Sequence, residues 1–183
     1  MPKLAAGLAK RVETAEAQHS SGGDFELLAP GVYVAQLREV TVRDKPNKHG
    51  AGIWSTEFHN LHFLETLERK PGRQWYDFTL PLPQDKPTAI YLAEGGTPDK
   101  WEKYQVRLQG LLKGFFESFG YTVDSDTDEL LGEWALITVK IGTIQQGPKQ
   151  GEKRNEVTGI DALPEDFDLA ALGIETADDD EAF

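Results

Sequence analysis

The sequence predicts a mainly β domain with a single long helix. Two stretches rich in β-branched and aromatic residues, 32–42 and 73–80, show alternation at period two. A run of apolar residues at helical spacing separates them from two further strand-like stretches, 134–144 and 154–160. With a strand between the first two, the expected order is three strands, one helix and two strands.

The first strand, residues 32–42, changes its alternation midway. Its first half, through Leu37, places apolar residues at odd positions, and its second half places Val40 and Val42 at even positions. One extra residue in a strand shifts the phase in this way, so we expect a β-bulge around Arg38-Glu39.

The second strand is expected from Ile53 to about Leu67. Period two would place Trp54, Phe58 and His62 on one of its faces. Because one face of each strand must fill the interior, most of these rings are expected in the core.

The third strand, residues 73–80, ends before a proline pair. Tyr76, Phe78 and Leu80 share one face, which leaves Trp75 on the other. Trp75 is therefore the best candidate for an exposed aromatic ring.

The helix is expected to begin after Thr97, a suitable N-cap residue followed by Pro98 at the first helical position. Gly120 stands where a glycine commonly ends a helix. The apolar residues at helical spacing, expected to close the core, are Trp101, Tyr104, Leu108, Leu111, Leu112, Phe115 and Phe119.

This element order is that of an OB-fold, a five-stranded, partly open barrel with its helix between strands three and four. Ligands of that fold cross the face of strands two and three, between the loop joining strands one and two and the loop joining strands four and five. Another small α+β barrel would have the same element order and remains an alternative.

The charge distribution divides the chain into three parts. Residues 161–183 hold nine of the 31 acidic residues and no base, whereas residues 1–160 hold the other 22 acids and all 19 bases, a net charge of −3. We expect a flexible lead-in at 1–24, an OB-fold-like domain at 25–160, and an acidic, disordered tail at 161–183.

Composition excludes several classes of protein. There is no cysteine, so a disulfide scaffold, a thiolate metal site and a cysteine nucleophile are excluded. No apolar run is long enough to span a bilayer, and the N-terminal apolar stretch is too short for a secretory signal. A cytoplasmic protein without a membrane partner is expected.

Two loops concentrate positive charge in this nearly neutral body. Residues 43–49 carry four basic or imidazole side chains against one acid, and residues 149–154 carry three bases against one acid. In the predicted topology both loops flank one cleft, which would attract a polyanion. The alternative is that the loops are merely solvated and discourage pairing at sheet edges.

Single-stranded nucleic acid is bound where bases stack on aromatic rings inside a basic groove. Trp75, flanked by Arg73 and Asp77, supplies such a ring in this sequence. The candidate DNA-binding residues are Arg38, Arg43, Lys45, Lys48, His49, Trp54, Arg73, Trp75, Lys149, Lys153 and Arg154.

Enzymatic motifs are not found in the sequence. His59 and His62 are expected on opposite faces of their strand, so they would not form a convergent ligand pair. Glu57 and His59 would share a face, which keeps a metal site conceivable. The sequence lacks a GxxxxGK[ST] phosphate loop and a nucleophile elbow. We therefore expect a binding protein, not an enzyme, with no cofactor and no resident metal.

Five stretches of the body read, in chain order, PGVYVAQLREVTVR, KHGAG, WSTEFHNL, ELLGEWALITVKIG and GEKRNEVTGI. Together with the helix they resemble single-stranded DNA-binding proteins encoded by bacteriophages, over about residues 28–160. The resemblance implies a protein that coats and protects single-stranded DNA in phage replication or recombination, in the cytoplasm of the infected host. A homo-oligomer is compatible with it.

The C-terminus reads DDDEAF. It resembles the acidic tip of bacterial single-stranded DNA-binding proteins, with Ala182 where proline is usual. The resemblance implies that this tip recruits replication or recombination proteins (a polymerase, a helicase or primase, or an exonuclease). The tip residues are Asp178, Asp179, Asp180, Glu181 and Phe183.

Three alternatives remain at this stage. The tail could be a solubilising segment. The chain could be an interaction hub that binds proteins and no DNA. It could also be a metal-dependent nuclease, for which Glu57 and Asp77 are the nearest strand acids.

Overall fold

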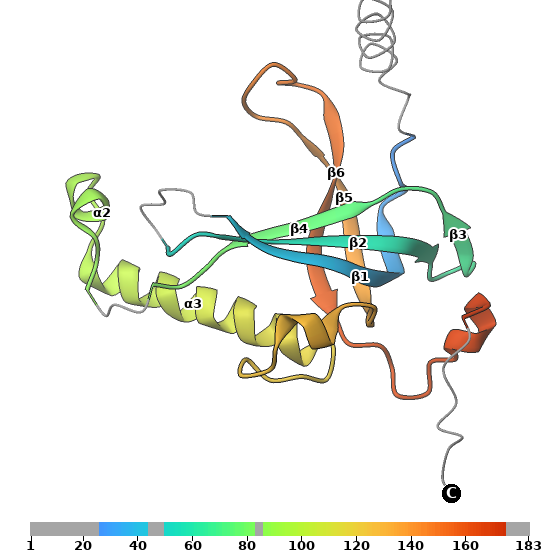
Figure 1. Cartoon of the computed structure of the whole chain (residues 1–183). Helices are drawn as coiled ribbons and strands as arrows, with labels where there is room; N and C mark the ends of the chain where they lie inside the picture. Colours follow the sequence, from blue (N-terminus) through green and yellow to red (C-terminus); the bar gives the residue numbers. More distant parts are fainter. Residues whose placement is uncertain (1–25, 44–49, 83–85, 175–183) are drawn as a thin grey trace, which may run out of the picture.

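The computed structural model describes residues 26–43, 50–82 and 86–174. They form a mainly β structure in which an antiparallel sheet of six strands packs on one main helix (Figure 1). The strands are β1 Gly31–Arg43, β2 Ile53–Phe63, β3 Glu68–Lys70, β4 Gln74–Thr79, β5 Trp134–Thr143 and β6 Lys153–Asp161. The helices are α2 Ala89–Ala93 and α3 Pro98–Glu117, and two short 3₁₀ turns are η1 Thr127–Leu130 and η2 Leu169–Leu172.

The expected order of three strands, one helix and two strands is confirmed only in outline, because a fourth strand, β3, and the short helix α2 also precede α3. The second strand ends at Phe63, not at Leu67. Residues 64–67 form a tight turn in which the Leu67 N–H donates to the Phe63 carbonyl at 2.6 Å, and Leu67 adopts a positive φ of 51°. The chain then returns along β2 as the short strand β3.

The predicted bulge in β1 is also confirmed. The β1–β2 register shifts between Leu37 and Glu39. A second shift, between Val34 and Gln36, lies opposite Asn60, whose φ of 52° is unusual for a residue with a side chain. This second irregularity had no signal in the apolar pattern.

The strand order is β3-β2-β1-β5-β6, and β4 pairs with the first half of β2 on the same edge as β3. The ladders of the described residues do not join β4 to β6, so the sheet is open. A closed five-stranded barrel is therefore not confirmed.

Helix α3 covers one face of the sheet, and the loop between β5 and β6 projects on the other side (Figure 1). The Thr97 side chain caps the helix by accepting from the Lys100 N–H at 3.4 Å, as expected. Trp101, Leu108 and Phe115 are buried along the predicted helix face. Phe115 belongs to the core that the strands supply, together with Tyr33, Leu37, Phe58, Ile137 and Val139 among others. Trp101 packs on Tyr91 of α2, with ring centroids 5.0 Å apart.

The predicted end segments are described only in part. Residues 1–24 and the tip residues Asp178, Asp179, Asp180, Glu181 and Phe183 lie outside the described part of the chain. The stretch 161–174 is described and contains η2, whose first turn is capped by Asp168 through the Ala170 N–H at 3.0 Å. Within the described residues, no helix is both long and apolar enough to cross a membrane.

Candidate nucleic-acid interface

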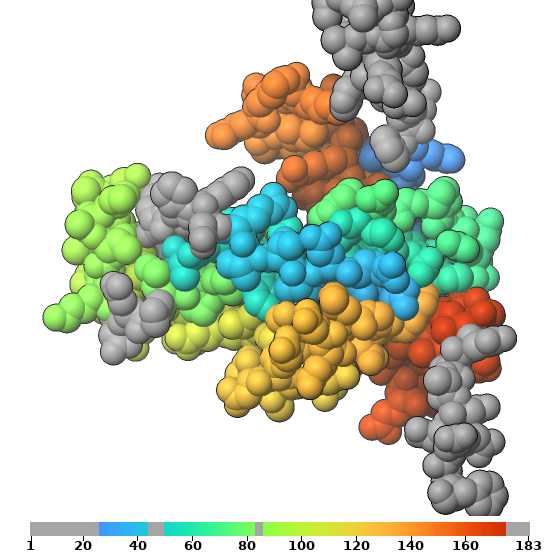
Figure 2. All heavy atoms as spheres, in the orientation of Figure 1, coloured from blue at the N-terminus to red at the C-terminus, as the bar shows by residue number. Residues whose placement is uncertain are grey.

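A groove of about 1180 Å³ is lined by β4 and the residues before it, and by β6 and the loop before it. Its lining includes Arg73, Trp75 and Asp77 from β4 and the residue before it, and Lys149, Lys153 and Arg154 from the hairpin. Figure 2 shows that the β5–β6 hairpin (orange) stands out from the body of the domain. The groove thus brings together five of the predicted DNA-binding residues, which are up to 81 positions apart in the chain.

Trp75 is the exposed aromatic ring of this groove. Its exposed fraction is 52%, whereas Phe78, on the opposite face of β4, is 7% exposed. Trp75 pairs with Glu57 across the β2–β4 ladder. The predicted division of β4 into an apolar face and a Trp75 face is therefore confirmed.

Trp54 is a correction to the candidate set. Its ring lies 5.5 Å from that of Phe115 and 5.9 Å from that of Phe116, centroid to centroid, and the residue is only 7% exposed. Trp54 pairs with Phe78, so both belong to the face that α3 covers. Trp54 fills the core and offers no ring face to a ligand.

The arginines on this side of the sheet are paired with carboxylates. Arg73 lies 3.4 Å from Glu57, and Arg154 lies 2.9 Å from Glu156. The predicted concentration of positive charge is therefore smaller than the sequence suggested, because each of these cations meets an anion on its own or a neighbouring strand.

Arg43 makes a third such pair, which spans three strands. Its guanidinium lies 3.3 Å from Asp77 Oδ2 and also donates to the Ser55 hydroxyl. The Ser55 hydroxyl in turn donates to Asp77 Oδ1 at 2.6 Å. This network orders β1, β2 and β4 at the same level of the sheet, next to the groove residue Asp77.

The two lysines of the hairpin, Lys149 and Lys153, differ from the arginines in having no carboxylate partner among the described residues. Lys153 donates to the Thr143 hydroxyl at 2.7 Å, a neutral acceptor. Lys149 is exposed, and neither lysine forms an ion pair with a described residue. The positive charge that the groove can offer to an anion therefore lies mainly on the hairpin.

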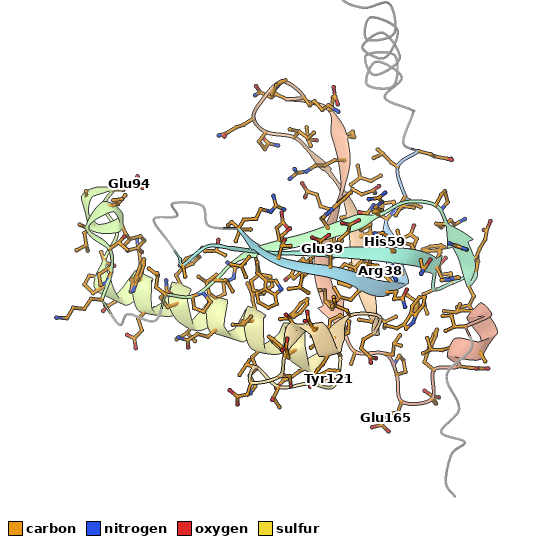
Figure 3. All side chains as sticks on the ribbon, in the orientation of Figure 1. Arg38, Glu39, His59, Glu94, Tyr121 and Glu165 are labelled. Atoms are coloured by element: carbon orange, nitrogen blue, oxygen red, sulfur yellow. The ribbon has the colours of Figure 1, made fainter. Side chains whose placement is uncertain are left out.

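The remaining candidate residues lie elsewhere. Arg38 is exposed on β1 beside Glu39, at the bulge, and does not line the groove (Figure 3). Lys45, Lys48 and His49 are outside the described residues.

Glu57 contacts His59 on its own strand, β2, and Arg73, which directly precedes β4. Its Oε1 lies 2.6 Å from His59 Nε2 and 3.4 Å from Arg73 Nη1. The hydrogen bond with His59 is the main reason that the pKa of Glu57 is below its ordinary value, with the charges of His59 and Arg73 adding to it. Glu57 is therefore ionised at neutral pH and holds Arg73 beside Trp75.

The two histidines of β2 correct another expectation. The pairs Gln36 with His59 and Val34 with His62 place both imidazoles on one face of the sheet, because the bulge at Asn60 changes the phase of β2. His62 is 6% exposed and its ring lies 6.1 Å from that of Trp134. Even so, the described residues contain no cluster of three or more side chains that could hold a metal ion.

Two residues of the groove were missed by sequence reasoning. Glu156 could have been found, since it stands two positions after Arg154 on one strand. The role of Asn155 could not have been found, because its partner Leu28 is 127 positions away.

Comparison with protein-family models gives no match for this chain, and comparison with curated proteins gives none either.

Proposed function

We propose that the chain is a non-enzymatic single-stranded DNA-binding protein whose strand lies in the groove between β4 and the β5–β6 hairpin. The observation that carries the proposal is a half-exposed tryptophan, Trp75, facing a groove whose other wall bears Lys149, Lys153 and Arg154. An exposed ring supplies a stacking surface for bases, and lysines along one wall supply contacts to phosphates.

The position of the groove supports an OB-fold as the finer description of this domain. If the three-residue strand β3 is an insertion, then β4 is the third strand, and β5 and β6 are the fourth and fifth. The groove then lies between the third strand and the loop joining the fourth and fifth, which is where ligands of that fold bind.

The proposed biological role follows from the resemblance of the sequence. The protein would coat DNA during phage replication or recombination in the cytoplasm of the host, and its acidic tip would recruit a replication or recombination enzyme. The tip is anionic like DNA, so it can also compete for the groove.

A hub that binds only proteins is the second candidate. The pairing of Arg43, Arg73 and Arg154 with carboxylates favours it, because it lowers the attraction of this face for a polyanion. A hub would need neither an exposed Trp75 nor the lysines of the hairpin, and reversing the charge at Lys149 and Lys153 would leave it unimpaired.

The direct test is binding of the full chain to a fluorescently labelled thymidine oligonucleotide, followed by anisotropy at several salt concentrations, with a duplex of equal length as control. We expect saturable binding to the single strand that weakens as salt rises, and weaker binding to the duplex. A chain ending at Ile174, which keeps η2, should bind the single strand more tightly if the acidic tip competes with DNA for the groove. No binding to the single strand by either chain at low salt would overturn the proposal.

A further inference from the structure

We propose that Arg69 is a further phosphate-binding residue for the single strand, and that the strand continues past Trp75 along β3 instead of ending at the groove. Arg69 does not line the groove and is not among the residues that the sequence suggested for DNA binding. The inference rests on the proposed function and extends the path of the same strand across the sheet.

Strand β3 extends the line of β4 along one edge of β2. Both strands pair with β2 on the edge opposite β1, and Figure 1 shows β3 at the end of the sheet, beyond the start of β4. Arg69 pairs with His62 and Trp75 pairs with Glu57, so the two positions lie five residues apart along β2, or about 16 Å. The lining of the groove reaches back to Pro71, two residues after Arg69. A nucleic-acid strand that follows this edge from Trp75 therefore passes over Arg69.

Arg69 and Trp75 also lie on the same face of the sheet. Directly opposed residues of two paired strands share a face, so Arg69 lies on the face of His62, and Trp75 lies on the face of Glu57. The bulge in β2 places His62 on the face of His59. His59 in turn bonds to Glu57 on that face, at 2.6 Å. Arg69 and Trp75 are thus open to the same ligand.

A series of neutral side-chain amides holds the Arg69 guanidinium in place. Its Nη2 donates to Asn60 Oδ1 at 3.1 Å, and Asn60 Nδ2 donates to Gln36 Oε1 at 2.8 Å. Gln36 Nε2 then donates to the Gly132 carbonyl at 2.9 Å. The series connects β3 with β2, β1 and the turn before β5. A guanidinium has five N–H donors, so this one bond orients Arg69 and leaves donors for a ligand.

The backbone at Asn60 is part of the same arrangement. Asn60 has a φ of 52°, in a region that residues with a side chain adopt at an energetic cost. Its amide lies between Arg69 and Gln36 and bonds to both. Such strain is found where the surrounding structure fixes it, often at ligand-binding positions. The bulge of β2 thus serves to position one arginine.

Charge distinguishes Arg69 from the paired arginines of this side of the sheet. Arg43, Arg73 and Arg154 each lie within 3.4 Å of a carboxylate. Arg69 is exposed and forms no ion pair with a described residue, and the neighbouring Glu68 is held by Lys70 at 2.8 Å. An oriented guanidinium whose charge is not compensated binds phosphate oxygens in pairs. Arg69 therefore offers a phosphate what the paired arginines do not.

The test is the salt dependence of binding of the full chain to a labelled thymidine oligonucleotide of about 16 nucleotides, the upper end of the length that one OB-fold covers. Arg69→Gln should reduce the slope of log affinity against log salt by about 0.7, the contribution of one phosphate contact. Arg107→Gln makes the same charge change on the exposed side of α3, which covers the opposite face, and should leave the slope unchanged. Thermal unfolding would show that both variants remain folded.

Arg69→Lys separates charge from structure. It keeps the positive charge and should keep the slope, whereas a slope that falls as far as in Arg69→Gln would assign the loss to altered packing around Asn60 and overturn the inference. Equal slopes in Arg69→Gln and the unaltered chain would also overturn it and leave the proposed function intact. The same holds if Arg107→Gln lowers the slope equally, since net charge alone would then explain the loss. Absence of binding by the unaltered chain would overturn the proposed function itself.

Discussion

The side chain of Asn155 binds both backbone groups of Leu28. Its Oδ1 accepts from the Leu28 N–H at 2.8 Å, and its Nδ2 donates to the Leu28 carbonyl at 2.8 Å. The Leu28 side chain is 8% exposed and belongs to the core. One residue of β6 thus fixes the segment that leads into β1 against a wall of the groove.

Asn155→Ala should destabilise the fold. It leaves a partly buried N–H and carbonyl of Leu28 without their partner, and each such loss costs about 1–3 kcal/mol where water does not replace the bond. Chemical denaturation would measure the free energy of unfolding. Gln150→Ala, in the exposed part of the hairpin loop, is the control and should change it by less than about 0.5 kcal/mol.

Trp75→Ala should weaken binding of single-stranded DNA and leave stability nearly unchanged. Loss of one stacking platform lowers affinity by about 1–3 kcal/mol, whereas a half-exposed ring contributes little to the core. The contrasting variant is Phe58→Ala, which empties a fully buried site and should destabilise the fold by about 3–5 kcal/mol. Unchanged affinity in the Trp75 variant would remove that ring from the binding site.

Lys149→Gln and Lys153→Gln should each reduce the salt dependence of binding. If each lysine contacts one phosphate, the slope of log affinity against log salt falls by about 0.7 per substitution. Lys103→Gln, an exposed residue of α3 away from the groove, controls for the change in net charge. Equal slopes in all three variants would mean that the hairpin does not contact the phosphates.

Glu57→Gln should destabilise the protein in a pH-dependent way. The pKa of Glu57 is depressed in the folded state, chiefly by its hydrogen bond with His59. Because this pKa is lower in the folded protein, the ionised Glu57 side chain stabilises the fold at pH values above its ordinary pKa of 4.5. The stabilisation is lost as the pH falls through the lowered pKa.

The measurement is the free energy of unfolding of both forms between pH 3 and pH 7. The difference between them should be constant above about pH 5 and shrink below it. A difference that stays the same across this range would show that the Glu57 carboxylate contributes no charge-dependent stability.

Much of this structure could be predicted because the faces of β4 and α3 follow from the local spacing of apolar residues. Period two in β4 separates Trp75 from Phe78, and the helical spacing of Trp101, Leu108 and Phe115 marks the buried face of α3. These features depend on neighbours within a few residues, so one sequence is enough to reveal them.

The errors came from contacts between strands. The bulge at Asn60 places His62 on the same face of the sheet as His59, and the apolar alternation of β2 does not indicate this bulge. The pairing of Arg43 with Asp77 joins residues 34 positions apart. Counting charges in the loops therefore overestimated the net positive charge on this side of the sheet, since two of the compensating carboxylates, Glu57 and Asp77, come from other strands.

Binding of a single strand against Trp75 can be measured by the quenching of tryptophan fluorescence on addition of a thymidine oligonucleotide, in the unaltered chain and in Trp75→Phe. Trp54 and Trp101 are buried and Trp134 is half-buried, so Trp75 is the tryptophan that a strand in the groove would contact. We expect saturable quenching in the unaltered chain and loss of most of it in Trp75→Phe. Equal quenching in both chains, or none in either while the strand binds, would contradict a binding site built on Trp75.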